Sequence, residues 1–171
     1  ITQGWGDNMG NSFPGVKVAN RGISGDTTRG VLIRMKGDVP SLMPTGLVIL
    51  IGTNDLEEKA SSEVIAGNLK LIIAELKKHN AKMPIILCNT FPSSASKRRP
   101  ADQIKKINQL YFATVKEAPP ITVLDTWPLF ACPFYTSDDP DDNLCVVLGL
   151  HPHTQKQTTD NDTKTRHESN S

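Results

Sequence analysis

The chain has 171 residues, and its 19 basic and 18 acidic side chains give a formal net charge of +1. This length suits one globular domain with a substantial core and is short of two typical domains. The balanced charge gives no electrostatic case for nucleic acid or a membrane surface as a partner. No apolar run approaches the roughly 20 residues that a membrane span requires.

Short apolar runs divide the chain into predicted strands. They lie at residues 16–19, 47–51, 84–88 and 121–124. The last three are nearly continuous in apolar residues, which is typical of parallel strands covered on both faces. Strand starts fall about every thirty to forty residues, the length of a βαβ unit.

Helical periodicity fills the intervals between these strands. Apolar residues recur every three or four positions in three segments: Val31, Met35 and Val39 before Pro40; Ile65, Leu69, Ile72 and Leu76 behind a cap at Ser61 or Ser62; and Ile104, Ile107, Tyr111 and Val115 behind Pro100. The pattern predicts an α/β fold, a parallel sheet with helices on both faces.

Three further features have structural interpretations. Cys88 lies in an apolar run and is interpreted as a buried, inert thiol, whereas Cys132 and Cys145 could pair under oxidising conditions. The run Lys97-Arg98-Arg99 is predicted to be solvated surface. Residues 155–171 contain no aliphatic or aromatic side chain, so we expect a folded domain over 1–153 and a disordered tail over 154–171.

Two loops carry the most specific motifs. Asn-Arg-Gly-Ile-Ser-Gly-Asp-Thr-Thr at residues 20–28 follows the first predicted strand, and Gly-Thr-Asn-Asp at 52–55 follows the second. Both therefore lie at carboxyl ends of predicted parallel strands, where open α/β sheets place their ligands. Together with Gly-Leu-His-Pro at 149–152, they resemble three of the four sequence blocks of the SGNH (GDSL-type) ester hydrolases. The resemblance covers roughly residues 1–153.

The resemblance implies a flavodoxin-like, three-layer α/β/α fold and a serine acyl-enzyme mechanism. Gly25 would offer its backbone N–H and Asn54 its side-chain amide to the oxyanion, each such donor being worth roughly 3 kcal/mol. His151 would move the proton between the nucleophile and the leaving alcohol. The family also uses a serine in a Gly-Asp-Ser start, and residues 1–5 resemble the segment that comes directly after this serine in the family.

The first strand and the serine are therefore expected to be missing from these 171 residues. In the family that strand lies inside the sheet, so the strands at 16–19 and 47–51 would lack their shared partner. We then expect an aggregation-prone or molten chain, unless another segment or another subunit fills the gap. Leu148 stands where the family usually has the aspartate that orients the histidine. Ser24 lies in the oxyanion loop with no evident base beside it, so it is no substitute for the serine.

Each site residue has a structural alternative. Gly25 could serve a tight turn before a helix capped by Thr27 or Thr28. Asn54 and Asp55 could cap the next helix, and we interpret Asp55 as structural in either case.

Other patterns could suggest a metal, but only weakly. His151 beside Pro152 could be a surface histidine. The pair His151 and His153 lacks a third metal ligand, and the acidic run at 138–142 lacks the glycine and glutamate of an EF-hand, so no metal site is predicted.

We expect an ester hydrolase for short acyl, acetyl-like esters of carbohydrates or small alcohols, because no long apolar lid segment is present. The chain by itself would be impaired by the loss of the serine. The alternatives are a pseudoenzyme or fragment that only binds ligand, and a flavodoxin-like flavin or nucleotide binder, which is disfavoured because no glycine-rich phosphate loop follows a strand. No cofactor is implied. The sequence leaves the compartment and the oligomeric state open.

Overall fold

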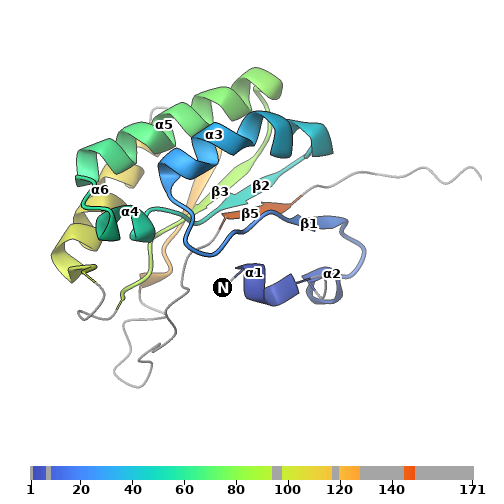
Figure 1. Cartoon of the computed structure of the whole chain (residues 1–171). Helices are drawn as coiled ribbons and strands as arrows, with labels where there is room; N and C mark the ends of the chain where they lie inside the picture. Colours follow the sequence, from blue (N-terminus) through green and yellow to red (C-terminus); the bar gives the residue numbers. More distant parts are fainter. Residues whose placement is uncertain (1, 7–8, 94–97, 117–119, 128–144, 149–171) are drawn as a thin grey trace, which may run out of the picture.

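The computed structural model describes residues 2–6, 9–93, 98–116, 120–127 and 145–148 (Figure 1). Five strands form one sheet in the order β1-β5-β2-β3-β4. Their bounds are Val18–Asn20, Leu47–Ile49, Ile85–Cys88, Ile121–Leu124 and Cys145–Leu148 for β1 to β5. The four predicted strands are all present. β1, β2 and β3 are shorter than the apolar runs that indicated them, and β1 begins two residues later than predicted.

The parallel part of the sheet comprises β2, β3 and β4. Leu47 pairs with Ile85, and Ile85 in turn pairs with Ile121, so that consecutive strands of the chain are neighbours in space. This arrangement confirms the predicted parallel α/β sheet. It also sends the loops that follow these strands to one common edge.

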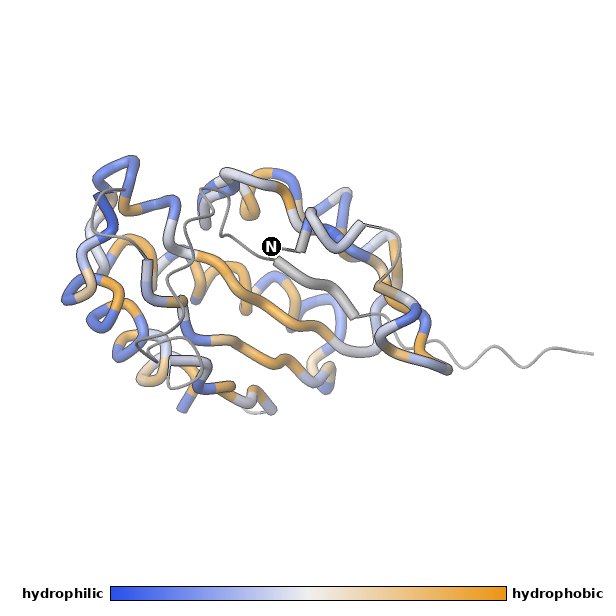
Figure 2. Tube along the Cα trace, turned by 90° about the horizontal axis from the view of Figure 1, so that it is seen from below, coloured by the Kyte–Doolittle hydropathy of each residue, from blue (hydrophilic) through white to orange (hydrophobic). Residues whose placement is uncertain are grey.

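Three long helices cover one face of the sheet: α3 (Thr28–Asp38), α5 (Ser62–His79) and α6 (Ala101–Lys116). Three of their ends were predicted: Ser61 caps α5 by accepting a hydrogen bond from the Val64 N–H at 3.3 Å, α6 begins directly after Pro100, and α3 ends before Pro40. Their apolar faces and the parallel strands share one core of twenty buried hydrophobic residues. Figure 2 shows continuous hydrophobic stretches along the central strands β2 and β3.

The opposite face carries only the short helices α1 (Thr2–Trp5) and α2 (Met9–Ser12) among the described residues. A second buried cluster lies there, formed by Met9, Leu50 and Cys88. Burial raises the pKa of the Cys88 thiol to about 11, which agrees with the inert thiol expected from its sequence context.

The layers make a three-layer α/β/α arrangement with one thin layer. Ile86 and Leu124 are 38% and 48% exposed, so the expectation that these strands are covered on both faces is wrong there.

β5 lies between β1 and β2 and runs antiparallel to both (Figure 1). Leu148 pairs with Val18, and Val146 pairs with both Asn20 and Val48. These are the two strands that were expected to lack a shared partner, so a later segment of the same chain fills the gap.

Candidate functional site

The loop between β1 and α3 contains the first predicted site residue, Gly25. Its φ is 77°, in the left-handed region that glycine adopts without steric cost, and an added Cβ would meet nothing within 4 Å. The backbone therefore needs glycine for its conformation and faces open space. Thr27 caps α3, its hydroxyl accepting a hydrogen bond from the Gly30 N–H at 3.1 Å. The turn before a threonine-capped helix is thus present, and it is compatible with a binding role for the exposed glycine.

The loop after β2 contains the second predicted site residue, Asn54, and meets the first loop. Asn54 is 5% exposed and its Nδ2 donates to the backbone oxygen of Asp26 at 2.9 Å. This bond joins positions 28 apart in the chain. The structure therefore brings the Gly25 loop and Asn54 together at the carboxyl edge of β1 and β2. Their catalytic roles stay predictions.

Helix capping does not explain Asn54 or Asp55. They lie inside the short helix α4 (Thr53–Glu57), whose N-cap is Gly52 with no side-chain cap. The capping alternative is therefore wrong, and both side chains are free to point across the loop.

Asp55 links the two loops through buried hydrogen bonds. It is 3% exposed, and its carboxylate accepts hydrogen bonds from the backbone N–H and the hydroxyl of Thr28. Asn68 on α5 donates to the same hydroxyl at 2.9 Å. Burial raises the pKa of Asp55, and the hydrogen bonds from Thr28 oppose that rise. These contacts fit the structural role that we assigned to Asp55.

The floor of the Asn54 loop is held by side chains from the neighbouring elements. The Ile51 carbonyl accepts hydrogen bonds from the Tyr111 hydroxyl at 3.1 Å and the Thr90 hydroxyl at 3.3 Å. Burial, together with the charge of Asp55, raises the pKa of Tyr111 well above its usual value, so this hydroxyl remains a donor. These two hydrogen bonds therefore fix the position of the backbone just before the Asn54 loop.

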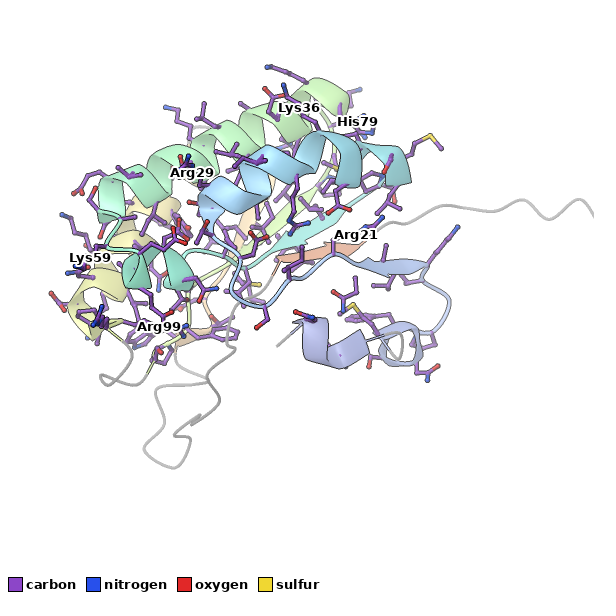
Figure 3. All side chains as sticks on the ribbon, viewed as in Figure 1. Arg21, Arg29, Lys36, Lys59, His79 and Arg99 are labelled. Atoms are coloured by element: carbon purple, nitrogen blue, oxygen red, sulfur yellow. The ribbon has the colours of Figure 1, made fainter. Side chains whose placement is uncertain are left out.

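Arg99 is the residue that the sequence interpretation missed. It is 1% exposed, and its Nη2 donates to Asn54 Oδ1 at 2.9 Å, while its Nε lies 3.0 Å from Glu57 Oε1 on α4. Figure 3 shows it beside α4, at the start of α6. The prediction of solvated surface is wrong for Arg99 and right for Arg98, which is exposed with φ 53°. Two adjacent arginines look alike in a sequence, and only the turn at Arg98 directs one of them inward.

Several predicted features lie outside the described residues: His151, His153, the acidic run 138–142, Lys97, Cys132 and the tail over 154–171. Leu148 is the last described residue before His151, and it pairs with Val18, the first residue of β1. Gly25 and Asn54 instead follow the last residues of β1 and β2. Leu148 therefore stands at the edge of the sheet opposite the Gly25–Asn54 site.

Within the described part of the chain, no three His, Cys, Asp or Glu side chains gather closely enough to hold a metal ion. In the same residues no helix combines the length and apolarity that crossing a membrane requires.

Comparison with known proteins points to one family. A sequence model of the GDSL-like lipase/acylhydrolase family matches residues 1–155. The subunit alpha2 of platelet-activating factor acetylhydrolase IB from Homo sapiens is 30% identical over 115 residues, which cover 67% of this chain and 49% of that protein. The chain thus spans about half the length of the curated relatives that it matches.

Solved structures agree with the fold. A GDSL-like protein from Parabacteroides merdae superposes with a TM-score of 0.62 at 22% identity, covering 76% of this chain and 63% of that one. A GDSL-like lipase from Bacteroides thetaiotaomicron gives a TM-score of 0.52 at 32% identity, covering 64% and 56% of the two chains. The first likeness supports the fold alone.

Proposed function

This chain belongs to the GDSL-like lipase/acylhydrolase family, and on that premise we propose that its site serves ester hydrolysis through an acyl-enzyme. Gly25 N–H and the Asn54 amide act as oxyanion donors, and His151 acts as the general base and acid. The observation that carries the proposal is the bond between Asn54 Nδ2 and the Asp26 carbonyl, which places the amide beside the Gly25 loop. Preorganised donors of this kind supply the largest single share of catalysis in many hydrolases.

The substrate class is a short acyl ester, acetyl-like, of a carbohydrate or a small alcohol. The relatives named platelet-activating factor acetylhydrolase support an acetyl group. The loops that frame the site are short, and the exposed backbone at Gly25 has open space above it. No organic cofactor or metal is needed for this chemistry.

The 171 residues contain no Gly-Asp-Ser, and the proposed mechanism takes its nucleophile from that motif. In hydrolases stripped of triad members, the oxyanion donors alone retain a residual acceleration of roughly 10³–10⁴ over water. We therefore expect near-background activity from this chain. An extended chain, in which a β-strand ending in Gly-Asp-Ser precedes Ile1, is expected to hydrolyse esters.

A second candidate function is ligand binding without catalysis. β5 occupies the position between β1 and β2, where the family resemblance places the strand that ends in the serine. A chain that keeps β5 there keeps the Gly25 and Asn54 loops without that nucleophile.

Hydrolysis of p-nitrophenyl acetate tests the proposal. We expect activity from the extended chain, about 10²–10³-fold less in its Asn54→Ala variant, and no loss in the control Asn80→Ala, an exposed asparagine at the end of α5. p-Nitrophenyl dodecanoate should be the poorer substrate. An extended chain whose rate is unaffected by Asn54→Ala would refute the oxyanion role. Stoichiometric labelling of the unextended chain by a fluorophosphonate would show that a residue within it, such as Ser24, is the nucleophile.

A further inference from the structure

The guanidinium of Arg99 lies between two partners on α4. Its Nη2 donates to Asn54 Oδ1 at 2.9 Å and its Nε lies 3.0 Å from the Glu57 carboxylate, one helical turn further along. The arginine side chain is 1% exposed, whereas Glu57 is 43% exposed. A buried charge is costly unless it is paired, and the Glu57 carboxylate supplies the opposite charge, although the Arg99 Nε makes no hydrogen bond of good geometry among the described residues.

The chemistry of the two groups around Asn54 fixes which way its amide points. A guanidinium can only donate hydrogen bonds, so the atom that faces Arg99 must be the amide oxygen. The Asp26 carbonyl can only accept, so the atom that faces it must be the amide nitrogen. A flipped amide would lose both hydrogen bonds. Its nitrogen would then face the Arg99 guanidinium, donor against donor, and its oxygen would face the Asp26 carbonyl, acceptor against acceptor.

The same count leaves one N–H of Asn54 without a partner among the residues that the structure describes. The amide nitrogen carries two N–H groups, and the Asp26 carbonyl takes one of them. The charge of Arg99 on the amide oxygen also draws electron density from the nitrogen, which makes the remaining N–H a stronger donor.

We propose that Arg99 is a positioning residue of the oxyanion site, holding the Asn54 amide so that its free N–H faces the ester oxygen. The inference rests on the proposed function in its catalytic part, because it assigns Arg99 no contact with substrate. Its structural part, the fixed amide, can be tested without any activity. Arg99 belongs to the loop before α6, so the donor on α4 is oriented by a different element of the fold.

The first test uses the 171-residue chain itself and its side-chain amide signals in ¹⁵N-correlated NMR spectra. The Asn54 pair is identified by its loss in Asn54→Ala. We expect it to be shifted from free-asparagine values and slow in hydrogen exchange, and to move to free values in Arg99→Met. The matched control is Arg98→Met, which removes the exposed neighbouring arginine and should leave the pair unchanged. An Asn54 pair that is unaffected by Arg99→Met would overturn the proposal.

The second test is kinetic and uses the extended chain. Arg99→Met should lower kcat about 10- to 100-fold with KM within about twofold, because a misdirected donor loses transition-state stabilisation and not substrate binding. Glu57→Gln, which keeps the bond to Asn54, should retain nearly all of kcat. In an Asn54→Ala background, Arg99→Met should have no further effect.

If the loss of kcat in the double variant equals the product of the losses in Asn54→Ala and Arg99→Met, then Arg99 acts independently of the amide. That result would overturn the proposal. If Arg99→Met does not fold, Arg99→Lys replaces it, since an ammonium can keep the charge without bridging both partners, and it should give an intermediate shift of the Asn54 signals. Should Asn54→Ala itself leave the rate unchanged, the proposed function fails, whereas the NMR result still decides whether Arg99 fixes the amide.

Discussion

The two sides of β2 are built differently. Toward β3 and β4 the sheet is parallel, its strands are consecutive in the chain, and three helices cover it with a core of twenty buried hydrophobic residues. Toward β5 and β1 the sheet is antiparallel, and its strands come from distant parts of the chain. The site therefore stands where the two kinds of pairing meet, because Asn54 follows β2 and Gly25 follows β1.

The largest expected contrast is between the two glycines of the site loops. Gly52 has φ 119°, and an added Cβ would lie 2.6 Å from the Tyr111 hydroxyl and 3.2 Å from an Ile65 methyl, whereas Gly25 has φ 77° and open space. Gly52→Ala should lower the free energy of unfolding by about 2–6 kcal/mol from backbone strain and overpacking together. Gly25→Ala should cost only about 1–2 kcal/mol. Urea denaturation measures both, and equal losses would contradict the difference in packing.

Two buried methionines compare the two cores directly. Met83 is 0% exposed in the large core, and Met9 is 2% exposed in the small cluster. Met83→Ala should cost about 3–5 kcal/mol, because its rigid neighbours leave a cavity. Met9→Ala should cost about 1–2 kcal/mol, because the partly exposed Phe13 and Phe91 around it can close the space. A larger loss of stability in Met9→Ala than in Met83→Ala would show that the cluster on the opposite face of the sheet contributes more to the free energy of unfolding than the large core does.

The pairing of β5 can be broken at Val146, which has a partner on both sides. Val146→Pro removes a backbone donor from an interior strand. We expect a loss of at most about 3 kcal/mol, because β5 can leave the sheet while the parallel side stays folded. Hydrogen exchange of the Ala19 and Val48 amides, fast in the variant and slow in the parent chain, reports the opening. Unchanged protection at both would mean that β5 does not hold this position in solution.

The smallest effect is a dependence of stability on alkaline pH from Cys88. Its pKa is raised to about 11 by burial from the usual 9.0. Since the folded state binds the thiol proton more tightly than the unfolded state, this contribution is present below pH 9 and is lost as the pH rises toward 11. The free energy of unfolding should therefore fall less between these values in Cys88→Ala than in the parent chain. Identical slopes for the two proteins would show that the thiol is accessible to water when folded.

The sequence predicts the parallel side well because each of its elements carries a local signal. The periodicity of α5, its cap at Ser61 and the apolar run of β3 are all readable within about twenty residues. The position of β5 is not readable in this way. Its pairing joins residues more than a hundred positions apart, and nothing local specifies whether an apolar run enters a sheet parallel or antiparallel.

For the site, the sequence motifs predicted that the loops of Gly25 and Asn54 meet. They did not predict the buried side chains that position these loops. Gly25 and Asn54 belong to motifs of characteristic spacing, and the structure places their loops in contact. Arg99 has no motif, because its role depends on a turn that buries one arginine and exposes its neighbour. Likewise, the Ile51 carbonyl accepts hydrogen bonds from the hydroxyls of Thr90 and Tyr111. A pattern of side chains in the sequence does not reveal a backbone partner.

The position of β5 has a consequence for peptide binding. Because β5 pairs with both β1 and β2, any other strand that enters between them must compete for the same backbone donors and acceptors. The affinity for an added strand is then the difference between two pairing free energies, and weakening β5 should raise it. The exchange also reverses polarity: a parallel strand would carry its carboxyl end to the edge of Gly25 and Asn54, whereas β5 carries its own to the opposite edge.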